Sequence, residues 1–156
     1  MRILAVDPGT AVSGYAVIDY VQGALRPLTW GAARTSPRDA MPARLLALHR
    51  CIQQLVDEFK PSVVAVEQLF FNRNASSALQ VGQARGVVLL AAALHGIPVA
   101  EFTPLQVKQA VTGLGRATKQ QVGYMVKALL KLEELPTPDD VTDALAVAIC
   151  CAHFAP

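Results

Sequence analysis

Apolar runs bounded by turn residues predict five short strands in this chain. The first run, ILAVD at residues 3–7, has four apolar residues and stops at Pro8-Gly9, which is typical of a buried strand. Gln22-Gly23 separates the next two runs as a turn. The run SVVAVE at residues 62–67 repeats the opening pattern, an apolar strand that ends in an acid. The predicted strands cover residues 3–7, 13–20, 25–34, 62–67 and 99–102.

Longer stretches with helical spacing alternate with these strands. Residues 42–59 place apolar side chains on one helix face, and Lys60-Pro61 ends that helix. Gly96 is placed to end a helix over residues 76–95, and Thr103-Pro104 is a good helix start. The remaining predicted helices run from 104 to before 113, from a Thr118–Gln121 capping box to about 132, and from 137–138 through 152.

This order of elements indicates the fold class. Strands and helices in this order favour an α/β fold, a mixed sheet with helices on its faces. The apolar strands suit the centre of such a sheet. We find no internal repeat, no low-complexity segment and no linker, so residues 1–156 are expected to form a single domain.

Composition narrows the class further. With 53% apolar and 17% charged residues, the chain is expected to be globular. Its longest unbroken apolar run, residues 144–152, has nine residues, so we expect no membrane association. The start of the chain does not fit a signal peptide. Three cysteines without a CxxC motif favour buried, reduced thiols in a cytoplasmic protein.

The small net charge of +2 hides an asymmetry along the chain. Residues 73–131 carry seven basic side chains and one acid, whereas residues 132–156 carry five acids and no Lys or Arg. A basic middle section suits an anionic partner such as nucleic acid. An ordinary solvated surface would show the same charges, so charge alone leaves both interpretations open.

Four acids form a candidate site. Asp7 and Glu67 each end an apolar strand, and if the strands are neighbours the two carboxylates emerge side by side. Asp140 and Asp143 are three apart and share a helix face, while Asp139 is assigned to a different face. Acids in a first helical turn also favour the helix dipole, and a strand-end acid can simply point to water. Asp143 precedes nine apolar residues and therefore needs a partner.

Clustered carboxylate oxygens are the ligands of hard divalent ions. Asp7, Glu67, Asp140 and Asp143 together would suit Mg²⁺ or Mn²⁺. Two such ions could activate water and stabilise the leaving oxygen of a phosphodiester. The hypothesis from the residues is a metal-dependent phosphodiesterase site.

Several motifs carry a resemblance to a known family. The segments ILAVDPGT, VEQLFF, SALQVGQARG, QVKQAVTGLGRATKQQV and DDVTDALAVAI resemble the RuvC family, the bacterial Holliday-junction resolvases, which are ribonuclease H-like nucleases. The resemblance covers nearly the whole chain and implies a ribonuclease H-like five-stranded sheet flanked by helices. It places the family's metal-binding acids on Asp7, Glu67, Asp140 and Asp143, although relatives can carry His at the position of Asp140.

The resemblance also implies an activity and partners. It implies a crossover junction endodeoxyribonuclease that resolves four-way (Holliday) DNA junctions by symmetric paired nicks in homologous recombination and DNA repair. It implies a homodimer that works beside a branch-migration motor complex of the RuvA and RuvB type. The Ala-rich helix at 76–95 is a candidate for the dimer interface.

Four further residues are candidates for DNA contact. Phe70 matches the family's stacking aromatic, which would stack on an unpaired base at the junction centre; packing into the core is the alternative. Lys108, Arg116 and Lys119 flank Gly113-Leu-Gly115, where glycines let backbone approach a phosphate. Lys108 and Lys119 match basic residues that the family uses near the scissile phosphate. Without the family match, a solvated helix face would be the simpler interpretation.

Other functions were weighed on the same residues. An actin-like or sugar-kinase-like ATPase would need two domains around its nucleotide, and this chain predicts one. Another ribonuclease H-like nuclease with a different structured substrate stays open. So does a nucleic-acid-binding module without catalysis, although such a module has no need to retain all four acids.

Overall fold

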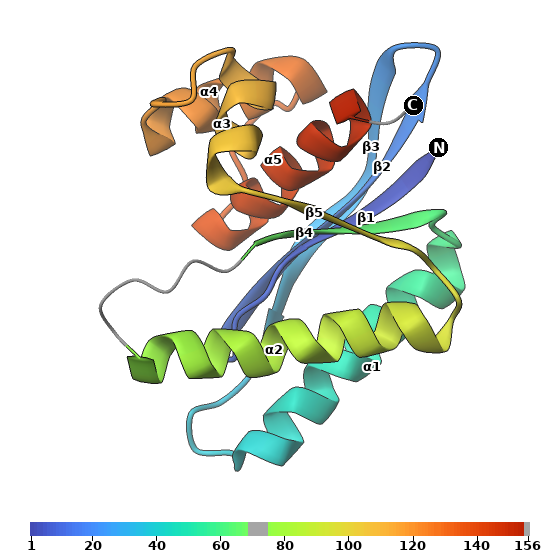
Figure 1. Cartoon of the computed structure of the whole chain (residues 1–156), viewed down its shortest axis with the longest axis vertical. Coiled ribbons are helices and arrows are strands. Elements are labelled where there is room, and N and C mark those ends of the chain that lie inside the picture. The colour runs from blue at the N-terminus through green and yellow to red at the C-terminus, as the bar shows by residue number, and fades with distance from the viewer. Residues whose placement is uncertain (69–74, 155–156) are drawn as a thin grey trace.

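The computed structural model of the chain describes residues 1–68 and 75–154 (Figure 1). Its strands are β1 (Arg2–Asp7), β2 (Val12–Val21), β3 (Ala24–Arg34), β4 (Val63–Glu67) and β5 (Val99–Phe102). Its helices are α1 (Met41–Phe59), α2 (Ala75–Leu94), α3 (Pro104–Thr112), α4 (Lys119–Leu130) and α5 (Asp139–Phe154).

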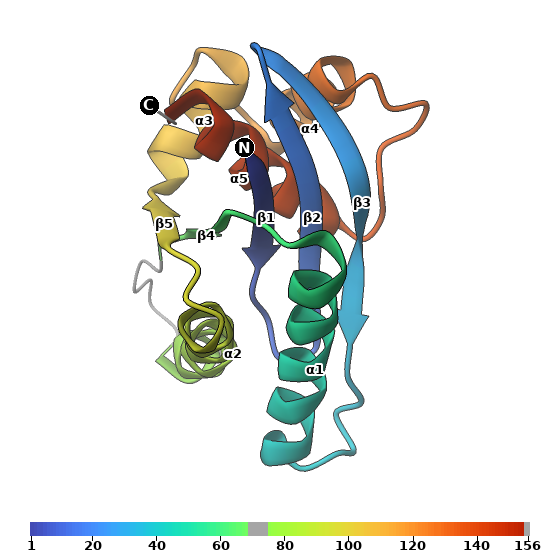
Figure 2. The ribbon, with the colours of Figure 1, turned by 90° about the vertical axis from the view of Figure 1, so that its right-hand side faces the viewer.

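The strands form one mixed sheet in the order β3-β2-β1-β4-β5. β1 pairs antiparallel with β2 and parallel with β4, and β4 pairs parallel with β5. Figures 1 and 2 show α1 and α2 on one face of the sheet and α3, α4 and α5 on the other. The predicted α/β class and five-stranded mixed sheet are confirmed.

Side-chain alternation along β1 assigns each face to a core. Ile3 and Ala5 belong to the apolar cluster that includes α5, and Leu4 and Val6 belong to the cluster under α1 and α2. Successive side chains of a strand point to opposite faces, so Asp7 continues the row of Ile3 and Ala5. The face under α5 therefore receives the acid that ends β1.

The predicted elements agree with the structure to within one or two residues at their ends. Thr118 and Gln121 form the expected capping box, with Thr118 Oγ1 accepting from the Gln121 N–H and Gln121 Oε1 accepting from the Thr118 N–H. Gly96 has φ +65° just beyond α2, the left-handed backbone that glycine tolerates. The last helix begins at Asp139, one residue after the Thr137-Pro138 start predicted for it.

Helix α2 has an unusually apolar surface. By length and composition alone, Ser76–Leu94 could cross a membrane, with a mean hydropathy of 1.3. One such helix is weak support for a membrane span, because the apolar helices of soluble proteins pass the same test. Ala84, Val88 and Ala91 pack into the cluster with α1 and the sheet, so α2 is a core helix on that side.

Candidate active site

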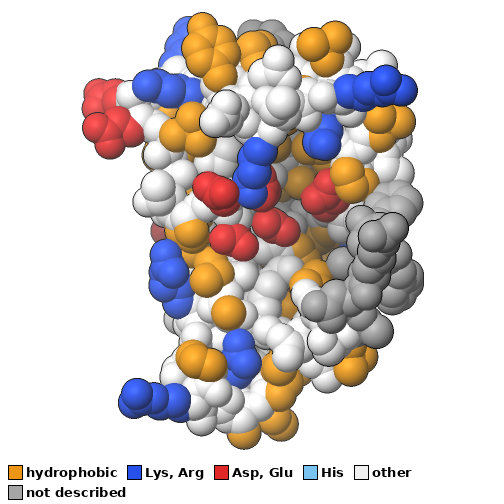
Figure 3. All heavy atoms as spheres, turned by 90° about the vertical axis from the view of Figure 1, so that its left-hand side faces the viewer, with side chains coloured by type: hydrophobic (Ala, Val, Ile, Leu, Met, Phe, Trp, Pro, Cys, Tyr) orange, Lys and Arg blue, Asp and Glu red, His pale blue; other side chains and the backbone are white. Residues whose placement is uncertain are grey.

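The strand-end acids Asp7 and Glu67 meet at one edge of the parallel pair β1–β4. The register pairs Val6 with Val66, one residue before each acid. Ala65 lies in the same apolar cluster as Ile3 and Ala5, so Glu67 also continues on the α5 face. Figure 3 shows acidic side chains gathered around a basic one on this part of the surface. The predicted pairing of the two strands is confirmed.

Gly14 lets the first turn of α5 approach the sheet beside Asp7. Gly14 pairs with Asp7 in the β1–β2 register. A Cβ built on Gly14 would lie 1.9 Å from the backbone oxygen of Asp140, so only glycine fits there. This contact places Asp140 and Asp143 over the end of β1. Gly14 was missed at the level of sequence, where a glycine within a strand could have signalled a close backbone approach.

Asp7 is under the electrostatic influence of the other three acids. Burial, with added repulsion from Asp143, Asp140 and Glu67, raises the pKa of Asp7 from 3.8 to about 7. Burial and Asp143 also raise the pKa of Glu67. Like charges held together in a half-buried place favour either protonation or a bound cation.

Lys119 supplies a cation from the chain itself. Its Nζ lies 3.2 Å from Asp139 Oδ2 and 3.2 Å from Asp143 Oδ2. Burial works to lower the pKa of Lys119, but its hydrogen bonds and charge interactions with these two acids outweigh burial and raise that pKa. For Asp143, burial raises the pKa and Lys119 partly offsets the rise.

This pairing corrects the assignment of Asp139. Asp139 was placed on a different helix face from the cluster, yet it shares Lys119 with Asp143. The physical reason is that positions four apart on a helix also share a face. Asp139 remains 76% exposed, so it lies at the rim of the acidic cluster.

A pocket of about 250 Å³ opens beside the acids. Its polar lining comes from Glu67, Asp143, Lys108 and Lys119, and its apolar lining from Pro104, Val107, Val122, Ala146 and Val147. Lys108 acts to lower the pKa of Glu67, against the effect of burial. The structure thus brings two of the predicted DNA-contacting lysines to the acids.

The other two predicted DNA contacts are not brought to this pocket. Arg116 is exposed, lies outside the pocket lining and has no ion pair within the described part of the chain. Phe70 lies outside the described residues. Arg85, counted above within the basic middle section, is largely buried against Glu101 and does not contribute to a basic surface.

The donor set fits a hard divalent ion in charge and in chemistry. Asp7, Glu67, Asp140 and Asp143 offer only carboxylate oxygens, and their mutual repulsion would be relieved by a cation. Across residues 1–68 and 75–154, no three acidic, His or Cys side chains already point to one ion position. In this structure Lys119 supplies a counter-charge to Asp143.

Comparisons with known proteins bear on the whole chain. Residues 3–151 match the family described as "Crossover junction endodeoxyribonuclease RuvC". The relative of that name from Desulfitobacterium hafniense is 58% identical over 153 residues, covering 98% of this chain and 93% of the relative. The one from Moorella thermoacetica is 55% identical over 156 residues, covering 100% of this chain and 93% of the relative.

Solved structures agree with the sequence comparisons. A structure described as Thermus thermophilus RuvC in complex with Holliday junction substrate is 37% identical, with a TM-score of 0.94, covering 99% of this chain and 94% of that one. The yeast mitochondrial Holliday junction resolvase, at 14% identity and a TM-score of 0.68, covering 97% of this chain and 78% of that one, shares the fold alone. The chain therefore belongs to the RuvC family of crossover junction endodeoxyribonucleases.

Proposed function

We propose that this chain is a structure-specific endodeoxyribonuclease that resolves four-way DNA junctions by paired nicks, in homologous recombination and DNA repair. One observation carries the proposal: Asp143, Asp140 and Glu67 all act on Asp7 at the end of β1 and, together with burial, raise the pKa of Asp7 to about 7. A family member solved with Holliday junction substrate has the same fold at 37% identity.

Asp7, Glu67, Asp140 and Asp143 would hold the divalent metal, as two ions of Mg²⁺ or Mn²⁺. When bound, such ions activate water and stabilise the leaving oxygen of a phosphodiester. The chain contributes the placement of the oxygens. Two come from neighbouring strand ends and two from the first turns of α5, which Gly14 seats on the sheet.

The two pocket lysines would receive the phosphate. In the free chain Lys119 balances the negative charge of Asp143. A phosphate bound beside Asp143 would give Lys119 a second anionic partner. Lys108 lines the other side of the pocket near Glu67. Arg116, exposed on the loop before α4, would contact the DNA backbone further away. Phe70 would stack on an unpaired base at the crossover and so favour an opened junction.

Symmetric nicks require two sites, and we assign the dimer interface to α2. Leu79, Leu90 and Leu94 are exposed by 65%, 55% and 66%, and helical spacing puts them on one stripe. Gly86 lies on the same stripe with open space around it, which would let a second copy of the helix approach closely. We further propose that the protein acts in the cytoplasm beside a branch-migration complex of the RuvA and RuvB type.

The test is a nicking assay on a synthetic four-way junction with and without divalent metal. Symmetric nicks that require metal are the expected result. Cleavage of another structured nucleic acid in preference to the junction would indicate a different ribonuclease H-like nuclease. Tight junction binding with no nick at any Mg²⁺ or Mn²⁺ concentration would indicate a binding module without catalysis.

A further inference from the structure

Arg85 is the one charged residue in the sequence of α2, and it is nearly buried. Its side chain is only 14% exposed, and its neighbours Ala84 and Val88 are fully buried under the sheet. A buried guanidinium is costly unless its donors are satisfied. Arg85 therefore needs hydrogen-bond acceptors within the fold, which an arginine exposed to solvent would not need.

Arg85 donates to two acceptors, and they lie on two different strands. Its Nη2 donates to Glu101 Oε2 of β5 at 2.6 Å. Its Nη1 donates to the backbone carbonyl oxygen of Glu67 in β4 at 3.5 Å, a long contact. The planar fork of the guanidinium suits such double recognition, because its donors are fixed relative to one another. One side chain thus ties α2 to the ends of two neighbouring strands.

Arg85 reaches Glu67 from the face of the sheet opposite to the acids. The helix that carries Arg85 packs with Leu4, Val6 and Val66, whereas the side chain of Glu67 continues the row of Ala65 toward α5. The charges that act on the Glu67 carboxyl group are those of Asp143 and Lys108, on the α5 side. The contact of Arg85 is with the backbone, so it bears on where the carboxyl group points.

The end of β4 has few other restraints within the described residues. Beyond the paired residues of β4 and β5, the Gln68 N–H donates to the Phe102 carbonyl at 2.8 Å. The Gln68 bond fixes the strand within the sheet, and the Arg85 fork fixes it against the helix behind the sheet.

We propose that Arg85 is a positioning residue for the nuclease reaction, which holds the last residue of β4 so that the Glu67 carboxyl group faces Asp7 and Asp143. This inference rests on the proposed function. Groups that orient metal ligands typically change metal affinity or activity by about 10–100-fold when they are removed. A loss in that range is expected here, without a matching loss of DNA binding.

The experiment uses the full chain and the variants R85M and R85K. R85M keeps much of the side-chain volume and removes both donors, and R85K keeps the charge on an ammonium that cannot reproduce the fork. Nicking rates are measured with enzyme in excess over a four-way junction, across a range of Mg²⁺ concentrations. Junction affinity without metal and the unfolding midpoint are measured in parallel.

We expect both variants to need about tenfold more Mg²⁺ for half-maximal nicking, or to nick about tenfold more slowly at saturation. Junction affinity should stay within about twofold of wild type, because the Arg85 side chain is only 14% exposed and its charge is paired with Glu101. E101Q, which weakens the ion pair and keeps the donor to Glu67, should show a smaller loss. R50M, which removes an exposed arginine of α1, is the matched control and should nick as wild type.

Three results would overturn the inference. Wild-type nicking by R85M and R85K at every Mg²⁺ concentration would show that Glu67 is positioned without Arg85. A loss that follows junction affinity, with R85K restored, would make Arg85 a DNA contact. If the loss of nicking is equal in R85M and E101Q and parallels only the fall in the unfolding midpoint, the Arg85–Glu101 ion pair has a purely structural role. If wild type itself nicks no junction, the proposed function fails and these variants do not bear on Arg85.

Discussion

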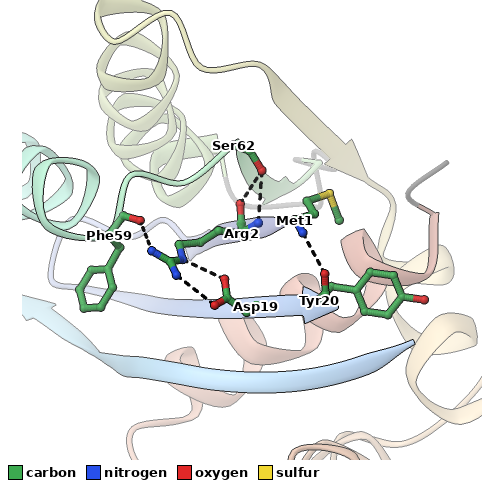
Figure 4. Close-up of polar contacts among 6 residues, drawn as sticks. All are labelled: Met1, Arg2, Asp19, Tyr20, Phe59 and Ser62. Carbon is green, nitrogen blue, oxygen red and sulfur yellow. Dashed lines mark hydrogen bonds and ion pairs between the residues drawn. The ribbon is translucent and has the colours of Figure 1, made fainter. Parts of the chain in front are cut away.

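An acid lies at each end of β1, Asp19 of the neighbouring strand β2 beside Arg2 at the N-terminal end and Asp7 at the C-terminal end, and the two acids have opposite surroundings. At the N-terminal end, Arg2 donates from Nε and Nη2 to both oxygens of Asp19 at 2.8 and 3.0 Å (Figure 4). Its third donor, Nη1, reaches the Phe59 carbonyl at the end of α1 at 2.7 Å. At the C-terminal end, Asp7 faces three more carboxylates.

The pKa values of the two acids move in opposite directions. The hydrogen bond from Arg2 lowers the pKa of Asp19, whereas burial and neighbouring acids raise that of Asp7. At the N-terminal end of β1 the charges of Arg2 and Asp19 are paired within the fold. Their contacts join β1, β2 and the end of α1. At the other end negative charge is left in excess, which destabilises the free chain and suits a cation. The comparison separates a stabilising ion pair at one end of β1 from the proposed reaction site at the other.

The largest expected effect comes from Asp7→Asn. Removing one proposed metal ligand should reduce junction nicking by roughly 10³-fold or more, because a bound metal contributes several kcal/mol to the transition state. Junction binding should persist, since the lysines and the fold are unchanged. The measurement is the nicking rate beside that of Asp39→Asn, an exposed acid as control. Nicking near the wild-type rate would remove Asp7 from the site.

Gly14→Ala tests the geometry of the active end without changing a charge. The added methyl would overlap the backbone of Asp140, so α5 must move off β2 and carry Asp140 and Asp143 with it. Overpacking of this kind costs about 1–3 kcal/mol. Both nicking and the free energy of unfolding should fall, measured by the junction assay and by urea titration. An unchanged nicking rate would contradict the seating role of Gly14.

Lys119→Ala removes the cation that the active end supplies for itself. Nicking should fall by about 10–100-fold, the usual range for a hydrogen bond to a charged group. Lys127→Ala, on the same helix and without an ion pair in the described chain, should fall less. Junction affinity should decrease as salt rises for both proteins, because phosphate contacts release counterions. Equal rates for the two variants would show that Lys119 is only one of many surface charges.

The pH dependence of stability should carry opposite signs at the two ends. A folded-state pKa of about 7 for Asp7, against 3.8, means that the folded chain binds more protons between these values, so stability falls as pH rises through that window without metal. Asp7→Asn should remove this loss and stabilise the metal-free chain at pH 7 by about 1–4 kcal/mol. Urea titrations at pH 4, 5.5 and 7 would measure it. Parallel profiles for variant and wild type would contradict the raised pKa.

The smallest effect is expected from Asp19→Asn at the other end. A lowered pKa means that Asp19 stabilises the fold above its unfolded pKa and that this contribution is lost as pH falls through its folded pKa. The variant should therefore be modestly less stable at pH 7 and equal to wild type in strong acid. Its nicking rate should be unchanged. A nicking defect in Asp19→Asn without a change in stability would contradict a purely stabilising role for Asp19.

Local sequence was enough to predict most of the elements. Apolar runs predicted the strands to within a residue or two, because a strand buried on both faces is a run of consecutive apolar residues. Thr103 before Pro104 and the Thr118–Gln121 capping box predicted two helix starts, because these signals use only residues up to three apart. The acids Asp7, Glu67, Asp140 and Asp143 were identified because each stands where an apolar segment begins or ends, and the family motifs agreed.

The tertiary structure decided which charges meet. Lys119 lies more than twenty residues from Asp143, and no local pattern joins them, yet their pairing sets the charge at the site. Asp139 was assigned to the wrong helix face because only the spacing of three between Asp140 and Asp143 was considered. Asp139 and Asp143 are four apart and also share a face. In the sequence Arg85 is only one of the bases of residues 73–131, and the packing of α2 largely buries it beside Glu101.

The sequence by itself determined the elements and the family and singled out the four acids as candidates, because propensity, capping and motif all act over a few residues. The approach of α5 to β2 depended on a glycine meeting a backbone more than a hundred residues away. The pKa of Asp7 depended on burial and on acids from two other elements. Only the packed fold could decide these, since electrostatic interaction and steric contact depend on distance in space and not along the chain.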